Sequence, residues 1–199
     1  MITRVQNNDG QLDQLQSVID QVNEVLGFDI NVARKPAGGT WQPAAATSGT
    51  DTACTNGTVY VGRIRIDAPC RATGIQYLIG SVGGTDKVIA SLYDESGNLL
   101  RASAAAGATV GTAANAQQVA FALNGALEAA TTIDLEPGFY YVGLTFNGTT
   151  AKFRSVPAHC QVGTNLLGNS LAQTFGTIGT TIAAPTTFTA DKVPVASLY

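Results

Sequence analysis

The sequence predicts a mainly β protein: an antiparallel jelly-roll β-sandwich preceded by a short N-terminal α-helix and an extended arm. Apolar and polar residues alternate in several short runs after residue 58, and turn-forming residues separate these runs. Near the N-terminus, apolar residues recur at helical spacing instead. About eight short strands with no helix between them are typical of an antiparallel sandwich.

The N-terminal helix is predicted over residues 8–26. Asn8 and Gln11 have the spacing of a capping box, and Gly27 supplies a C-terminal stop. The apolar residues recur at alternating steps of three and four, as in the a/d seam of a coiled coil. This seam consists of Leu12, Leu15, Ile19, Val22 and Leu26. An isolated helix of this length is marginal, so the seam must pack on copies of itself or on its own domain. Both remain open, and we expect a role in oligomerisation or anchoring.

A flexible arm or linker is predicted over residues 33–57, between the N-terminal segment 1–32 and a sandwich domain at 58–199. The arm contains Pro36, Pro43 and many glycines and small polar residues. Trp41, the single tryptophan of the chain, lies in its middle. Two interpretations stay open, because a large aromatic ring can anchor an interface or fold back onto its own sheet.

Strand candidates follow one another from residue 58 onward. In the first of them, residues 58–67, the alternation changes phase at Gly62, which predicts a β-bulge. The segment 93–100 predicts a hairpin, since Gly97 and Asn98 accept positive φ. Further alternating runs occupy residues 75–79, 88–92, 119–123 and 140–146. The turn at 136–138 introduces the last of these runs.

Composition argues against two classes of partner. Acidic residues number 14 and basic residues 11, which gives a net charge of −3. A surface poor in Lys and Arg does not suit a nucleic-acid backbone or an anionic membrane. No stretch approaches the roughly 18 consecutive apolar residues of a membrane span, and the first residues lack the pattern of a signal peptide. We therefore expect no nucleic-acid partner, no membrane insertion and synthesis in the cytoplasm.

No set of residues predicts an active site, and we expect neither catalysis nor a cofactor. His159 and Cys160 are adjacent, so in a strand they point to opposite faces and cannot easily form a thiol–imidazole dyad. Asp134 and Glu136 fit turn chemistry better than the acid pair of a glycosidase.

A metal site is not expected either. The loop at 94–98 gathers oxygen ligands but lacks the spacing of a calcium-binding EF-hand. Cys54, Cys70 and Cys160 lack the close pairing of a zinc site and are interpreted as buried or unreactive thiols. A bridge between Cys54 and Cys70 stays possible only outside a reducing cell.

Three parts of the chain resemble small jelly-roll virion proteins of tailed bacteriophages. They are Thr85–Asp94 with Ser96–Leu99, then Pro137–Leu144 through Asn147–Thr150 and Lys152–Arg154, and finally Pro185–Lys192 with Ala196–Tyr199. Such proteins serve as capsid cement or decoration, head fibres and tail-fibre tips, commonly as trimers.

The resemblance implies a structural protein of the virion, made in the host cytoplasm. It implies a homotrimer that binds the major capsid protein or other virion proteins and stabilises or decorates the head. The alternative is a fibre-associated or tail-associated receptor-binding module that recognises a host surface glycan. In that case, the loops at 80–86, 103–117 and 147–150 would carry specificity.

Overall fold

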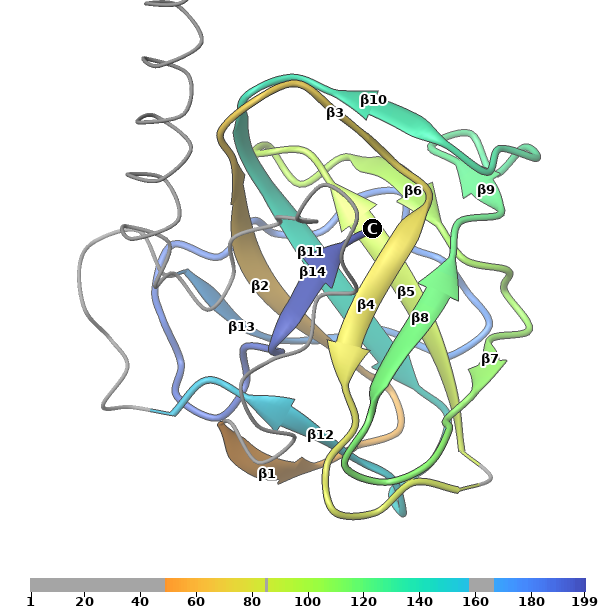
Figure 1. Cartoon of the computed structure of the whole chain (residues 1–199), viewed down its shortest axis with the longest axis vertical. Coiled ribbons are helices and arrows are strands. Elements are labelled where there is room, and N and C mark those ends of the chain that lie inside the picture. The colour runs from red at the N-terminus through yellow and green to blue at the C-terminus, as the bar shows by residue number, and fades with distance from the viewer. Residues whose placement is uncertain (1–48, 85, 158–166) are drawn as a thin grey trace, which may run out of the picture.

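The computed structural model describes residues 49–84, 86–157 and 167–199 (Figure 1). Within these ranges the protein is mainly β, and its strands pair antiparallel. The predicted helix at 8–26 lies outside the described residues, and so does the arm up to residue 48. No helix in the described ranges is both long and apolar enough to cross a membrane.

The strands are short, apart from two that run through the centre of the main sheet. They are β1 (Thr50–Ala53), β2 (Thr58–Ile66), β3 (Cys70–Ala72), β4 (Gly74–Leu78), β5 (Lys87–Tyr93), β6 (Leu99–Ala102), β7 (Ala108–Thr109), β8 (Ala116–Ala120), β9 (Leu123–Asn124), β10 (Ile133–Leu135), β11 (Gly138–Phe146), β12 (Lys152–Ser155), β13 (Gly168–Ala172) and β14 (Ala196–Leu198).

Two layers of strands face each other in a sandwich-like arrangement. The larger sheet has the order β13-β2-β11-β5-β6-β9, with β7 pairing with β5, and the smaller sheet has the order β14-β4-β8. The pair β1-β12 extends the smaller layer, because Gly80 N–H donates to the Lys152 carbonyl at 2.7 Å and Val195 N–H donates to the Arg154 carbonyl at 2.8 Å. The pair β10-β3 lies toward one end of the molecule (Figure 1).

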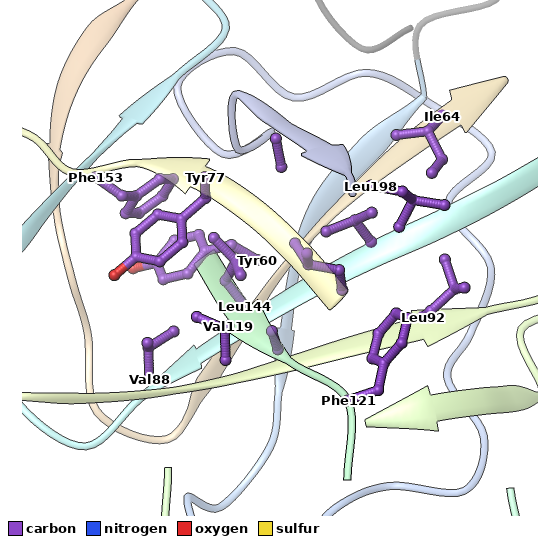
Figure 2. Packing of buried hydrophobic residues seen from close by; sticks show 14 of the residues in the cluster. Tyr60, Ile64, Tyr77, Val88, Leu92, Val119, Phe121, Leu144, Phe153 and Leu198 are labelled. Carbon is purple, nitrogen blue, oxygen red and sulfur yellow. The ribbon is translucent and has the colours of Figure 1, made fainter. Parts of the chain in front are cut away.

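The main core fills the space between these layers, with a group of aromatic rings within it (Figure 2). The ring of Phe146 lies 6.3 Å from that of Tyr60, 6.2 Å from that of Tyr77 and 5.7 Å from that of Phe153, between centroids. All four side chains are fully buried. The rings come from β2, β4, β11 and β12, so this group joins the two layers.

The outer face of the larger sheet is covered by the chain that follows β13. Ile178 is buried there against Val59, Val61 and other apolar residues of the sheet. Hydrogen bonds hold this covering segment in place: Ile182 N–H donates to the Gly97 carbonyl at 2.9 Å, and the Tyr141 hydroxyl donates to the Pro185 carbonyl at 3.1 Å. Both faces of the central strands are therefore buried.

This double burial explains why the predicted bulge at Gly62 is wrong. The register between β2 and β11 runs without a shift from Ile66 to Val59, and Gly62 lies opposite Val142. The phase of the apolar residues changes because Val59 belongs to the outer cluster, whereas Ile64 belongs to the main core. A register shift does occur elsewhere, between β5 and β6.

The structure also shows a strand inside residues 33–57, the segment predicted as a flexible arm or linker. β1 pairs with β12 along its whole length, and Cys54 after it is buried. The sequence did not predict this strand because its buried residue is the polar Thr52 and the strand has no alternating apolar residues. The hairpin at 93–100 is confirmed: Gly97 has φ 88° and its N–H donates to the Asp94 carbonyl at 3.0 Å.

Candidate functional site

Three loops meet at one end of the sandwich, along the bottom of Figure 1. We call this region the loop end; it comprises residues 80–84 with Asp86, 110–115 and 147–151. Ala114 N–H donates to the Gly80 carbonyl at 2.8 Å, and Val110 N–H donates to the Asp86 carbonyl at 2.8 Å. Parts of all three predicted specificity loops, at 80–86, 103–117 and 147–150, therefore lie next to one another in the structure.

Asp86 fixes the loop that joins β11 to β12. One of its carboxylate oxygens accepts the main-chain N–H groups of Thr150 at 2.9 Å and Ala151 at 2.7 Å. In return, the amide oxygen of Asn147 accepts the N–H of Lys87 at 2.6 Å. Each loop therefore supplies the hydrogen-bond partners of the other, which gives this end of the molecule a defined shape.

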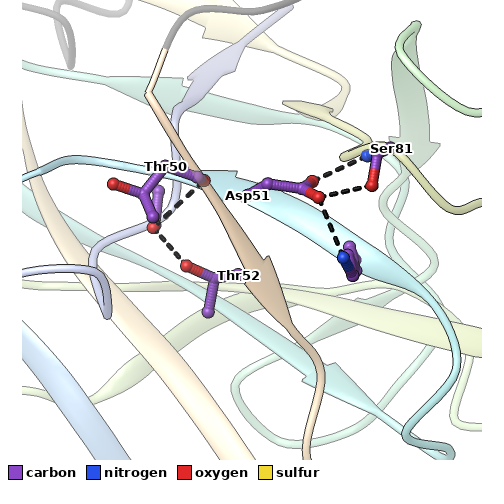
Figure 3. A network of polar contacts seen from close by, with 6 residues as sticks. Thr50, Asp51, Thr52 and Ser81 are labelled. Atoms are coloured by element: carbon purple, nitrogen blue, oxygen red, sulfur yellow. Dashed lines mark hydrogen bonds and ion pairs between the residues drawn. The ribbon is translucent and has the colours of Figure 1, made fainter.

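A second carboxylate, Asp51 on β1, ties three segments together (Figure 3). Its oxygens accept the Ser81 N–H at 2.7 Å, the Ser81 hydroxyl, and the Lys152 ammonium group at 3.1 Å. On the other side of β1, the hydroxyls of Thr52 and Ser155 are 2.6 Å apart. We call the group of Asp51, Ser81 and Lys152 the Asp51 clamp.

The Asp51 clamp keeps its carboxylate ionised. Burial raises the pKa of Asp51, but the hydrogen bonds from Ser81 and the hydrogen bond and positive charge of Lys152 outweigh it and lower the pKa to about 2. So acidic a carboxyl group is a weak general base near neutral pH. The Ser81 hydroxyl is bound to the same carboxylate, so the group's chemistry suits a structural tie better than a nucleophile with its base.

We expect Asp51→Asn to reduce stability at neutral pH but not in strong acid. A folded-state pKa of about 2, below the ordinary 3.8, contributes stability that is complete above 3.8 and is lost as the pH falls toward 2. Because the clamp is partly exposed, we expect a loss of about 1 kcal/mol at pH 7. Denaturant unfolding at several pH values tests this. A difference that stays constant down to pH 2 would contradict the assignment.

Gly80→Ala is expected to lower the free energy of unfolding by about 1–3 kcal/mol, because a Cβ at this position has no room. It would overlap an Asp51 carboxylate oxygen and lie only 2.7 Å from the Lys152 Cβ. Gly111→Ala, in the same loop end, is the matched control, since its nearest contact would be Ile79 Cδ1 at 3.6 Å. Equal unfolding midpoints for the two variants would show that Asp51 and Lys152 leave room for a side chain at position 80.

Apart from the partly exposed carboxylate of Asp86, the side chains that the loop end exposes to solvent are polar and uncharged. Its exposed side chains include Ser81, Thr112, Asn115, Asn147, Thr149 and Thr150. Hydroxyl and amide groups of this kind can exchange hydrogen bonds with a hydroxyl-rich ligand. The three loops contain no aromatic residue at their described positions, so they provide no ring on which a sugar could stack.

Several candidates from the sequence lie outside the described residues: the seam of Leu12, Leu15, Ile19, Val22 and Leu26, then Trp41, and the pair His159 and Cys160.

The acidic loop residues considered as metal ligands or catalytic carboxylates bind neighbouring groups of the protein instead. The Asp94 carboxylate accepts the main-chain N–H of Asn98 at 2.8 Å and its side-chain amide at 2.9 Å, so it holds the hairpin turn. Asp134 is paired with Arg71 at 2.7 Å in an exposed ion pair. Among the described residues, no group of three His, Cys, Asp or Glu side chains has an arrangement that could hold a metal ion.

Cys54 and Cys70 are both free thiols. Cys54 is buried, and this burial, with a smaller effect from Asp86, raises its pKa to about 12. Burial also raises the pKa of the half-buried Cys70. A thiol is nucleophilic as the thiolate, so neither group is activated at neutral pH.

No local pattern in the sequence marks the two carboxylates, Asp51 and Asp86, that organise the loop end. Asp51 lies 30 positions from Ser81 and 101 positions from Lys152. Asp86 lies 64 positions from Thr150. These pairings depend on which strands become neighbours, and no local spacing in the chain encodes that. The one local feature that could have drawn attention to Asp86 is its position next to the glycine-rich turn at residues 83–85.

Comparison of the chain with models of protein families, with curated proteins and with solved structures finds no match in any of the three.

Proposed function

We propose that this chain is a non-enzymatic structural protein of a bacteriophage virion, which stabilises or decorates the head as a capsid cement protein. In this proposal, residues 1–32 and the arm fasten the chain to sister subunits and to the major capsid protein. The β body is then displayed on the outside of the particle. The protein acts as a homotrimer, as in the virion proteins that it resembles.

The observation that carries this proposal is the close packing and hydrogen bonding of the β body. The central strands of the larger sheet are buried on both faces, and the loops at one end are hydrogen-bonded to one another. Its charged side chains also form local ties, as at Asp51 and Lys152. A cement protein needs a defined shape that spans neighbouring subunits, and apolar burial with strand addition supplies the contact energy.

A jelly-roll topology belongs to the same proposal. Strands distant in sequence are neighbours in space: β2 pairs with β11, and β4 pairs with β14. Long-range antiparallel pairings of this kind occur in Greek-key and jelly-roll sandwiches. The two-layer arrangement supports such a fold for the displayed body.

A particle-stability experiment tests the proposed role. Phage particles lacking this chain should release their DNA at a lower temperature than complete particles, and added purified protein should restore the higher temperature. The Leu15→Asp/Ile19→Asp variant should restore it less well, because it would lose its anchor. Identical release temperatures with and without the protein would contradict a cement function.

A receptor-binding module at a fibre or tail is the second candidate, and the gathering of three loops at one end favours it. Exposed hydroxyl and amide groups there match the chemistry of a glycan. Glycan-array binding by the purified protein, lost in Thr112→Lys and Thr149→Lys but kept in the exposed control Thr131→Lys, would support this candidate. Unchanged binding in the two loop variants would place the glycan elsewhere.

A further inference from the structure

β8 forms an edge of the smaller sheet. Within the described residues it pairs with β4 alone, and its residues Ala116, Gln118 and Ala120 are exposed. In Figure 1 it lies on the outer side of β4. An edge strand of this kind presents main-chain N–H and C=O groups that another strand can use.

The register identifies the groups that point outward. Phe121 N–H donates to the Thr73 carbonyl and Ile79 N–H to the Asn115 carbonyl, both at 2.9 Å. These bonds continue the β4–β8 register on either side of the strand, in which Ile75 lies opposite Val119. Hydrogen-bonded pairs alternate in an antiparallel ladder, so the odd-numbered residues of β8 bond to β4. The N–H and C=O groups of Ala116, Gln118 and Ala120 therefore point away from it.

The edge lacks the devices that usually block strand addition. Residues 102–127 contain no charged residue and no proline, and the β4–β8 register has no bulge. By contrast, β1, at the other side of the same layer, carries Asp51 beside Lys152. Charges, prolines and bulges are the common means by which natural edge strands avoid pairing.

We propose that β8 pairs antiparallel with β8 of a second copy of this chain, about a two-fold axis at Gln118. The outward-directed residues read Ala, Gln, Ala, so this axis places Gln118 opposite its counterpart and Ala116 opposite Ala120 of the second copy. Each such pair can exchange both of its N–H···O bonds. No charge opposes another across the contact, and the small alanines let the two sheets approach.

Side chains extend this complementarity beyond the backbone. On the face of the sheet that carries Gln118, its amide group donates to the Gln76 amide oxygen at 3.1 Å, and Ser197 lies opposite Gln76 in the register. A two-fold axis at Gln118 continues this polar row into the second copy. One short strand makes a small interface, so pairing is weak between two bodies and gains strength where copies are already held together.

Cysteine cross-linking of the full chain tests the register. Gln118→Cys should form an intermolecular disulfide on a non-reducing gel, because opposed residues in such a pair have Cα atoms about 5.5 Å apart. Ala120→Cys is also at an exposed position of β8 but lies opposite Ala116, so it should cross-link far less. The unsubstituted chain gives the background from its own cysteines. Equal cross-linking of the two variants, or none above the background, would overturn the proposal.

Charge substitution tests the same pairing without a cross-link. Gln118→Lys and Gln118→Glu should each lower the mass of the full chain in light scattering by a factor of about two or more, and mixing them should restore it. Ala172→Lys, at the exposed end of β13, should leave the mass unchanged. Thermal unfolding of each variant confirms that the body is folded. An unchanged mass in Gln118→Lys, or no recovery on mixing, would overturn the proposal, whatever the role of the chain in a virion.

Discussion

Phe146→Ala is expected to lower the free energy of unfolding by about 3–5 kcal/mol. The ring of Phe146 is fully buried and lies within 6.3 Å of the rings of Tyr60, Tyr77 and Phe153. These rings belong to both layers of the sandwich, so the cavity left by the truncation cannot close by moving one loop. The edge-on contacts with the two tyrosines are lost with the ring, in addition to its burial.

Denaturant unfolding of the full chain measures this effect, with Leu127→Ala as the matched control. Leu127 is 43% exposed, so its truncation should change the free energy of unfolding by less than about 0.5 kcal/mol. The melting temperature of Phe146→Ala should fall by about 10 °C, given about 2–4 °C per kcal/mol for a chain of this size. A loss below about 1 kcal/mol would show that these rings do not hold the layers together.

Leu15→Asp combined with Ile19→Asp is expected to break up the oligomer without unfolding the β body. Both residues belong to the predicted a/d seam, and a carboxylate at a seam position would be buried against its counterparts in neighbouring chains. If the seam forms a trimer, the mass in light scattering should fall by a factor of about three. The melting temperature of the β body should stay close to that of the unsubstituted chain.

A matched control separates the seam from the added charge. Gln14→Asp with Gln21→Asp adds the same two carboxylates to the predicted helix, but at positions outside the seam. This variant should keep the mass of the unsubstituted chain. A seam variant that keeps its mass and still binds particles would contradict the oligomerisation role.

The sequence was sufficient to predict that the described part of the chain is mainly β, because alternation and turns are local properties of the chain. The hairpin at 93–100 follows from Gly97, whose positive φ its turn requires. Tyr77 lies in the predicted strand run 75–79 and is fully buried in the structure. These features depend on a few consecutive residues and are therefore visible without a structure.

Other features depend on contacts between distant parts of the chain. The covering of the larger sheet by the segment around Ile178 buries a second face, which made the phase change near Gly62 look like a bulge. β1 was missed because an edge strand of small polar residues has no apolar period. The Asp51 clamp joins residues from three separate segments, so no sequence motif predicts it.

The copy number of this chain in purified phage particles tests the proposed function most directly. Quantitative mass spectrometry against the major capsid protein gives that number without any assumption about mechanism. A capsid cement protein should be present in amounts comparable to the capsid protein. A handful of copies per particle would contradict the cement role and favour a fibre or tail, and absence from the particle would contradict a virion role altogether.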